Sequence, residues 1–146
     1  MAVEIEKKFL VNSHEYRNMA SACHTIVQGY LSKEPERTVR IRIKDDKGFI
    51  TVKGKTIGCK RLEIDYPIPL DDAKDMLKLC LSPILEKKRY IVNYCGYKWE
   101  IDEFEGYLAP LVIAEVELPD ESLPLQLPAF IGEEVTGNPK YYNSNL

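Results

Sequence analysis

Charged side chains recur in this sequence as pairs separated by a single residue. The clearest pairs are Glu4/Glu6 and Glu115/Glu117 among the acids, and Arg40/Arg42 and Lys87/Arg89 among the bases. Carboxylate oxygens are hard ligands suited to Mg²⁺ or Mn²⁺. Arginine presents a planar fork to phosphate oxygens, and lysine presents a compact point charge. The two sets of residues together could therefore bind a complex of divalent cations and a polyphosphate.

A spacing of two residues is the period of a β-strand, so each pair places its charges on one face. The intervening positions are apolar, for example Ile5, Ile41 and Val116. The acids on these faces are Glu4, Glu6, Glu63, Asp65, Glu100, Asp102, Glu115 and Glu117, and the bases are Lys8, Arg40, Arg42, Lys44, Lys53, Arg61, Lys87 and Arg89. The polar face of a sheet commonly lies in water. If these charges instead line a lumen, their burial requires pairing or bound ions, which cations and a polyanion would supply.

The alternation predicts about eight strands. They cover residues 3–9, 26–31, 39–44, 50–53, 61–66, 84–92, 97–104 and 111–118. Short helices are expected at residues 73–81, which Asp71 or Asp72 could cap, and near residues 15–23, with an irregular wrap or short helix over 119–130. Short turns between neighbouring strands favour antiparallel pairing. The expected fold class is α+β, mainly antiparallel, and eight strands suffice to close a barrel around a small ligand.

Composition excludes several classes of protein. The 146 residues fit one domain, and no linker or repeat divides residues 1–146. A net charge of −3 gives no global attraction to nucleic acid or anionic lipid. No apolar run is long enough to span a membrane, and the first residues show no signal-peptide pattern. We therefore expect a cytoplasmic protein.

The remaining reactive residue types suggest no other chemistry. The four cysteines, Cys23, Cys59, Cys80 and Cys95, lack the C-x-x-C spacing of a zinc site and are interpreted as reduced thiols. There is no Gly-x-x-x-x-Gly-Lys phosphate loop. Phosphoryl transfer needs charge neutralisation and alignment more than a nucleophilic side chain, so the charged strand faces are the better candidates.

The segment Glu4-Ile5-Glu6-Lys7-Lys8 resembles the E-x-E-x-K signature of the CYTH domain, or triphosphate tunnel metalloenzymes. Further matches follow in the family's order. They are Gln28-Gly29-Tyr30-Leu31, Thr38-Val39-Arg40-Ile41-Arg42, Thr51-Val52-Lys53-Gly54, Arg61-Leu62-Glu63, Lys87-Lys88-Arg89-Tyr90, Trp99-Glu100-Ile101-Asp102, Ala114-Glu115-Val116-Glu117-Leu118, Glu134-Val135-Thr136-Gly137 and Lys140-Tyr141-Tyr142-Asn143. The resemblance spans nearly the whole chain, and the length is similar to that of the short bacterial members.

The resemblance implies an eight-stranded antiparallel tunnel with charged side chains inside, and it implies roles for particular residues. Metal ions would be held by Glu4, Glu6, Glu115 and Glu117, with support from Glu63 and Asp102. Phosphates would be held by Lys8, Arg40, Arg42, Lys53, Arg61, Lys87, Arg89 and Lys140. Catalytic roles would fall to Lys8, Tyr30, Arg61 and Lys87, with Tyr30 hydrogen-bonding a phosphate or the attacking water. Four charged residues are left undecided between the site and structural ion pairs: Lys44, Lys55, Asp65 and Glu100.

The leading hypothesis is hydrolysis of inorganic tripolyphosphate to pyrophosphate and phosphate with two Mg²⁺ or Mn²⁺ ions. One ion would bridge phosphate oxygens, and the other would lower the pKa of the attacking water. Arginine and lysine would stabilise charge in the transition state.

Two alternatives remain open. An enzyme acting on an organic triphosphate (thiamine triphosphatase, nucleoside triphosphatase or class IV adenylate cyclase) ranks second, because Trp99 falls on the apolar, outward parity. A non-catalytic polyphosphate or nucleotide sensor would not need both acidic pairs. Short helices offer limited cover for the apolar outer side of the barrel, so a homodimer is a further expectation.

Overall fold

The computed structural model describes residues 3–120, 122 and 124–146, and most of them lie in β-strands. The strands are β1 (Val3–Val11), β2 (Ala22–Ser32), β3 (Thr38–Lys44), β4 (Lys47–Lys53), β5 (Lys60–Ile68), β6 (Leu81–Tyr94), β7 (Tyr97–Phe104), β8 (Val112–Glu117) and β9 (Ile131–Glu134). The helices are α1 (Tyr16–Met19), α2 (Leu70–Leu79) and the 3₁₀ turns η1 (Gly106–Leu108), η2 (Pro139–Tyr141) and η3 (Asn143–Asn145). In the described part of the chain, no helix is both long and apolar enough to cross a bilayer.

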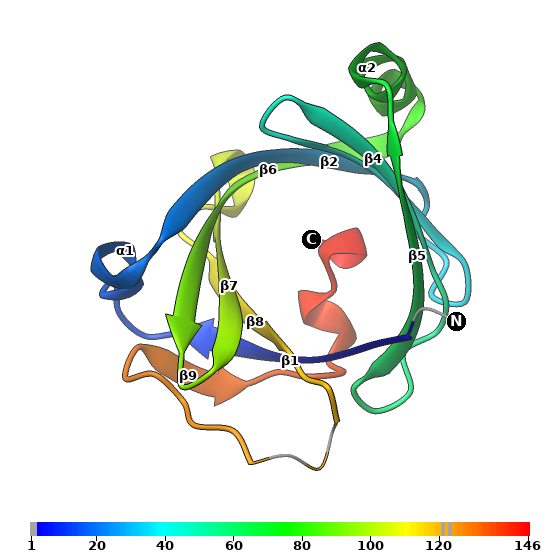
Figure 1. The fold of residues 1–146 in the computed structure, drawn as a ribbon. Helices are drawn as coiled ribbons and strands as arrows, with labels where there is room; N and C mark the ends of the chain where they lie inside the picture. The colour runs from blue at the N-terminus through cyan, green and yellow to red at the C-terminus, as the bar shows by residue number, and fades with distance from the viewer. Residues whose placement is uncertain (1–2, 121, 123) are drawn as a thin grey trace.

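Strands β1 to β8 form a closed antiparallel barrel (Figure 1). The sheet runs in the order β5-β4-β3-β2-β6-β7-β8-β1. It closes because the first residues of β1 pair with β5, with Val3 opposite Leu62, while the following residues of β1 pair with β8. The predicted eight-stranded barrel is therefore confirmed. The short strand β9, which the alternation did not predict, joins the far end of β1.

Two helices differ in extent from the prediction. Helix α1 ends at Met19, because Ala22 and Cys23 already pair with β6 as the first residues of β2. Helix α2 begins at Leu70, directly after Pro69. The acids expected to cap it lie in its first turn, where their charge complements the helix dipole.

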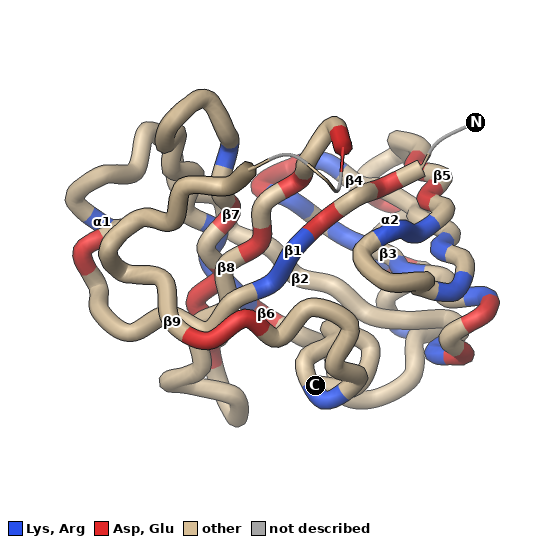
Figure 2. The backbone as a smooth tube through the Cα atoms, turned by 90° about the horizontal axis from the view of Figure 1, so that it is seen from below, with Lys and Arg blue, Asp and Glu red and all other residues tan. Residues whose placement is uncertain are grey.

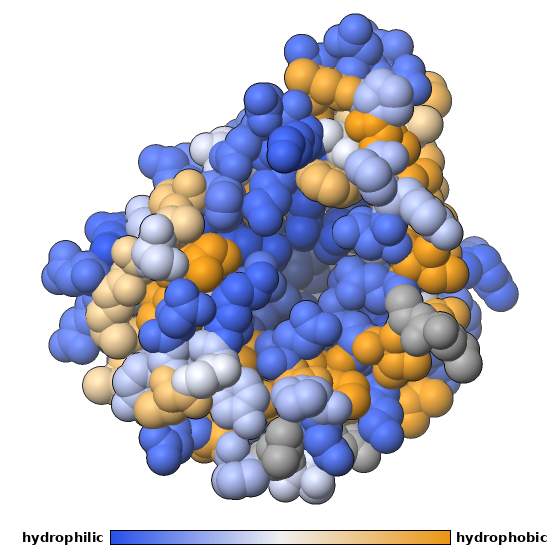
Figure 3. Space-filling model, in the orientation of Figure 1, coloured by the Kyte–Doolittle hydropathy of each residue, from blue (hydrophilic) through white to orange (hydrophobic). Residues whose placement is uncertain are grey.

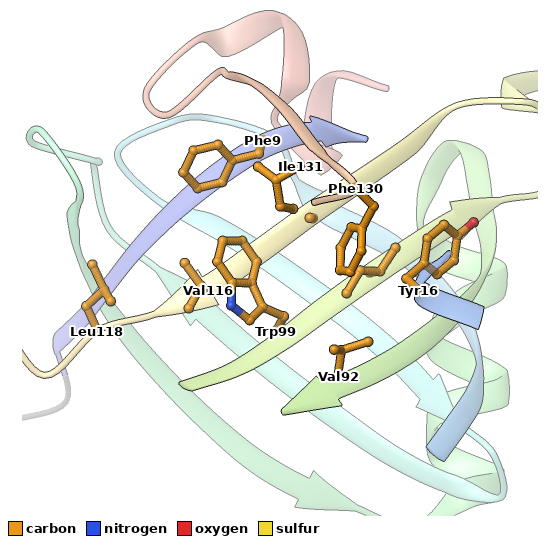
Figure 4. Packing of buried hydrophobic residues seen from close by; sticks show 10 residues of the cluster. Phe9, Tyr16, Val92, Trp99, Val116, Leu118, Phe130 and Ile131 are labelled. Atoms are coloured by element: carbon orange, nitrogen blue, oxygen red, sulfur yellow. The ribbon is translucent and has the colours of Figure 1, made fainter. Parts of the chain in front are cut away.

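An apolar cluster outside the barrel covers β1, β6, β7 and β8 (Figure 4). Trp99 and Val116 are fully buried there, and Phe9 packs on Trp99 with ring centroids 5.5 Å apart. The cover comes from Tyr16 of α1 and from the chain after β8, through Phe130, which contacts Tyr16. Burying each such side chain contributes about 1.5–3 kcal/mol. Phe130 and the half-buried Leu125 are the residues that the predicted segment 119–130 adds to the outer core, and its residues 121 and 123 lie outside the described residues.

The outer surface of β3 and β4 is covered differently. Helix α2 packs there through Ala73, which approaches Gly48 so closely that a Cβ on Gly48 would lie 2.7 Å from the Ala73 Cβ. Farther along, Val52, Ile64 and Tyr66 stay partly exposed, at 41%, 39% and 64%. Cover is therefore incomplete, as the sequence suggested, and the homodimer stays a prediction.

A second apolar cluster occupies the inside of the barrel. It contains Tyr30, Leu85, Phe104 and Ile113, and the C-terminal residue Leu146 packs against it. Leu85 shares a strand face with Lys87, because side chains on one face recur every second residue. The C-terminal turns lie within the outline of the barrel in Figure 1. One end of the lumen is therefore filled by apolar side chains and by the C-terminal tail, residues 139–146. The alternation of charged and apolar residues did not reveal this filling.

Candidate functional site

The barrel encloses a cavity of about 580 Å³ that is lined mainly by charged side chains. Acidic and basic residues follow one another along β1 (Figure 2), and hydrophilic residues surround the hollow at the centre of the molecule (Figure 3). The predicted site residues that line the cavity are Glu4, Glu6, Lys8, Tyr30, Arg40, Arg42, Lys53, Arg61, Glu63, Arg89, Glu115 and Glu117. The prediction that the charged strand faces point into a lumen is therefore confirmed.

The C-terminal tail forms part of the cavity wall. Tyr142, Asn143 and Ser144 line it beside the strands. Lys8 Nζ donates a hydrogen bond to the Tyr141 backbone oxygen at 3.3 Å, and the Lys8 backbone N–H donates to Thr136 Oγ1 at 3.0 Å. The tail is thus fixed to β1 at the point where β1 presents its charges.

Two lysines of the cavity are paired with carboxylates. Lys8 Nζ lies 3.5 Å from Glu115 Oε1. Lys53 Nζ lies 3.7 Å from both Glu4 Oε1 and Glu63 Oε1. These side chains are only 10–23% exposed, so solvent screens the pairs weakly.

Asp102 connects two further cations, Arg89 in the cavity lining and the deeper Lys87. It accepts from Arg89 Nε at 2.7 Å and from Arg89 Nη2 at 2.9 Å, and it lies 2.7 Å from Lys87 Nζ. Burial alone would raise the pKa of Asp102, but Arg89 and Lys87 hold it well below its usual range. Arg89 Nη1 also reaches Glu100 Oε2 at 3.3 Å.

Three arginines of the cavity are held by neutral acceptors instead. Arg42 donates from Nε and Nη2 to Gln28 Oε1, at 2.9 and 2.6 Å. Arg61 donates to the Gly54 backbone oxygen at 2.6 Å and to Thr38 Oγ1 at 2.9 Å.

Arg40 is the third arginine, and its Nη2 donates to Thr51 Oγ1 at 3.1 Å. Its buried Nε has no hydrogen-bond partner among the described residues. Within the same part of the chain, neither Arg40, Arg42 nor Arg61 forms a salt bridge. Burial, together with Arg40 and Arg89, lowers the pKa of Arg42 to about 9, so the guanidinium is still charged at pH 7. The three charges are therefore available to an anion.

The carboxylates at the start of β1 are crowded. Burial, a hydrogen bond with Glu63 and the charge of Glu6 raise the pKa of Glu4 to about 10. Burial and the charge of Glu115 raise the pKa of Glu6 to about 7. The buried Glu4 Oε1 has no hydrogen-bond partner in the described chain. A divalent cation would relieve this repulsion in place of protons, so the residues fit a hard cation with oxygen ligands.

The protein alone does not supply a complete set of ligands for a metal ion in its described residues. In residues 3–120, 122 and 124–146, no group of three or more acidic, histidine or cysteine side chains converges on one point. Mg²⁺ commonly uses one or two carboxylates and completes its shell with water and substrate phosphates. Glu6 lies opposite Glu117 in the β1–β8 ladder, and Glu100 lies opposite Glu115 in the β7–β8 ladder, so carboxylates of neighbouring strands are available in pairs.

Three predicted site residues do not line the cavity. Lys87 is fully buried between Asp102 and Asn143 Oδ1, which it contacts at 3.0 Å, and Asp102 is 2% exposed. Lys140 is exposed, with its Nζ 5.5 Å from the ring centroid of Tyr141. The structure therefore places Lys87 and Asp102 inside the barrel, next to the inner apolar cluster and below the cavity, and leaves Lys140 outside the cavity.

Other residues reach the site without having been predicted there. Lys44, Asp65 and Glu100, left undecided from the sequence, line the cavity, whereas Lys55 does not. Thr38 lines it as well. Thr38, Gln28 and Asn143 all stand within the matched motifs, but only the structure reveals what each contacts.

The sequence matches the family model of the CYTH domain over residues 2–144. It is 47% identical to an inorganic triphosphatase from Acetivibrio thermocellus, in an alignment covering 100% of this chain and 94% of that protein. It is 31% identical to an inorganic triphosphatase from Nitrosomonas europaea, covering 98% of this chain and 95% of the relative.

Solved structures share the fold. The crystal structure of an inorganic triphosphatase is 28% identical, with a TM-score of 0.68 over 97% of this chain and 95% of the other. A Hippeastrum protein described as a putative adenylyl cyclase with a dominant triphosphatase activity is 16% identical, with a TM-score of 0.64 over 80% of each chain. The second likeness concerns the barrel alone.

Proposed function

This chain belongs to the CYTH domain family, and on that premise we propose that it hydrolyses inorganic tripolyphosphate to pyrophosphate and phosphate inside its barrel. The observation that carries the proposal is that one cavity holds both three arginines without a salt bridge among the described residues and a crowded group of carboxylates. A linear triphosphate with divalent cations satisfies both sets. Two relatives named inorganic triphosphatase, similar over nearly their whole length, support this choice of substrate.

Arg40, Arg42 and Arg61 hold the phosphate chain in this proposal. Their guanidinium groups are oriented by neutral acceptors before substrate arrives, so little reorganisation is needed when negative charge builds up in the transition state. Lys8 adds a cation from the wall beside the tail. Tyr30 Oη accepts a hydrogen bond from Gln28, so its own O–H can donate to a phosphate oxygen or to the attacking water.

Glu4, Glu6, Glu115 and Glu117 would hold Mg²⁺ or Mn²⁺, with two ions per site. When bound, the ions supply neutralisation of phosphate charge and a lower pKa for the attacking water. Glu63 supports the site through Lys53, whose Nζ lies 3.7 Å from both Glu4 Oε1 and Glu63 Oε1.

Asp102 and Lys87 act from below the cavity in this proposal. Asp102 binds Arg89 through two hydrogen bonds and so fixes the direction in which Arg89 faces the cavity. Lys87 joins Asp102 to the tail through Asn143.

Phosphate release from tripolyphosphate, measured with Mg²⁺ and with Mn²⁺, tests the proposal. The native chain should release one phosphate per tripolyphosphate, and the double variant Glu4→Gln/Glu6→Gln should not. If the native chain releases no more phosphate than that variant with either metal, the proposal is wrong.

An organic triphosphate is the second candidate, because Phe49 and Tyr142 line the cavity and could contact a ring. Trp99 cannot do so, since it is fully buried in the outer core, on the outward parity that the sequence predicted. A panel of tripolyphosphate, ATP and thiamine triphosphate ranks the candidates by kcat/KM. A higher value for either organic substrate would reverse the order.

A further inference from the structure

We propose that Gln28 is a positioning residue that fixes the guanidinium of Arg42 while leaving its positive charge available to the phosphate chain. The inference rests on the proposed function and deepens it by one residue. Gln28 lies on β2, opposite Arg42 in the β2–β3 ladder, and its side chain is fully buried.

The contact between the two side chains has a defined geometry. Gln28 Oε1 accepts from Arg42 Nε at 2.9 Å and from Nη2 at 2.6 Å. An arginine offers only donors, so the amide oxygen and not the amide nitrogen must face it. One neutral oxygen therefore binds the same edge of the guanidinium that a carboxylate would bind.

The other end of the amide is fixed as well. Gln28 Nε2 lies 3.3 Å from Tyr30 Oη and 3.4 Å from Asn143 Oδ1. Asn143 Oδ1 also accepts from Lys87 Nζ, at 3.0 Å. The Gln28 amide is thus held by the tail and by its own strand, and it cannot turn away from Arg42 without losing these contacts.

Arg89 provides a contrast inside the same barrel. It also lines the cavity and also donates from Nε and Nη2, but its acceptor is the carboxylate of Asp102. That pair is electrically neutral. Arg42 is oriented by similar hydrogen bonds and keeps a net positive charge. Arg42 is half-buried, where an uncompensated cation still costs free energy, and a phosphate group that binds next to Arg42 would remove that cost.

The substitution Gln28→Glu separates orientation from charge. A glutamate keeps an oxygen in front of Arg42 but adds a negative charge, so the pair becomes like Arg89 with Asp102. We expect KM for tripolyphosphate to rise by about tenfold or more, as for the loss of one charged hydrogen-bond donor, with a smaller change in kcat. Calorimetric binding of tripolyphosphate in EDTA should weaken similarly and depend less steeply on salt concentration.

Gln28→Met removes the acceptor without adding charge, and a double-mutant cycle with Arg42→Met tests whether Gln28 acts through Arg42. The double variant should bind tripolyphosphate as weakly as Arg42→Met alone. The matched control is Gln126→Met, the same change at an exposed glutamine away from the cavity, which should bind as the native chain does.

The inference is overturned if Gln28→Glu binds tripolyphosphate as tightly as the native chain, or if the effects of Gln28→Met and Arg42→Met simply add. If Gln28→Met fails to fold, as judged by thermal unfolding, Gln28→Glu still decides, because it preserves the side-chain volume. Absence of turnover in the native chain would contradict the proposed function, whereas the binding measurements in EDTA would still test the role of Gln28.

Discussion

At the scale of residues, the cations of the cavity differ in what holds them. Lys8, Lys53 and Arg89 have carboxylate partners, while Arg42 and Arg61 have neutral ones. A carboxylate partner cancels much of the charge of the first group, whereas a neutral acceptor orients Arg42 and Arg61 and leaves their charge uncompensated. Substitutions in the second group should therefore affect substrate binding most directly.

Replacing Arg61 by glutamine should lower kcat/KM for tripolyphosphate by about 100-fold, a loss typical of one preorganised donor to a transition state. The guanidinium hydrogen bonds to Gly54 and Thr38 are lost together with its charge. Steady-state phosphate release measures the effect. The control is Lys88→Gln, which removes a charge from an exposed position on the outward face of β6. This variant should change kcat/KM by less than about twofold.

The raised pKa of Glu6 predicts a pH dependence of metal binding. Burial and Glu115 bring this pKa to about 7, so Glu6 is largely protonated at pH 6 and largely ionised at pH 8. Protons and cations compete for the carboxylate. The affinity for Mn²⁺, titrated without substrate, should therefore rise between pH 6 and 8. Glu6→Gln should bind more weakly and with a flatter pH profile, and an unchanged profile would assign the titration to another group.

At the scale of elements, the strands could be predicted because Glu4, Arg42 and Lys53 alternate with apolar neighbours. Strand β9 could not, since Ile131–Glu134 is too short to show a period and pairs only through β1. The inner apolar cluster was missed because Leu85 lies on the same strand face as Lys87. The alternation predicts which face points inward, but not which part of the lumen is filled by apolar side chains.

For the site, the sequence predicted which residues line the cavity but not which side chains contact one another. Residue types along the strands, together with the family resemblance, identified the charged residues that line the cavity. They did not reveal that Asp102 and Lys87 pair below the cavity, because pairing depends on the distances between strands. Nor did they reveal that Gln28, an uncharged residue, contacts Arg42.

Phe130, just before β9, should contribute stability without contributing to substrate binding. Phe130 is fully buried against Tyr16 in the outer core. Phe130→Ala should reduce the free energy of unfolding by about 3–5 kcal/mol, the cost of removing a buried aromatic ring. KM for tripolyphosphate should stay unchanged below the unfolding temperature. Denaturant unfolding measures the loss, and Leu127→Ala, at a residue that is 47% exposed, should cost far less.

At the scale of the whole molecule, a barrel with a charged lumen is less stable than its hydrogen bonding alone suggests. The pKa values of Glu4 and Glu6 are raised in the folded state, to about 10 and about 7. Their protonated forms are favoured by folding, so this contribution is complete below about pH 4.5, the unfolded value. It is lost as the pH rises through the folded values.

Divalent cations should therefore stabilise the molecule more at pH 8 than at pH 6. Binding to the folded state raises stability by mass action, and ionised carboxylates bind more strongly. The gain in Tm on replacing EDTA with Mg²⁺ or Mn²⁺, measured at both pH values, tests this. Equal gains at the two pH values would contradict it, and Glu4→Gln/Glu6→Gln should show little gain at either.

The filled end of the lumen has a consequence for the order of events in turnover. Leu85, Phe104, Ile113 and the C-terminal residues fill that end of the lumen. We therefore expect pyrophosphate and phosphate to leave by the route through which tripolyphosphate entered. Departing pyrophosphate then meets the same guanidinium groups that the incoming molecule needs. A new tripolyphosphate can bind only after pyrophosphate has left, so accumulated pyrophosphate should act as a competitive inhibitor.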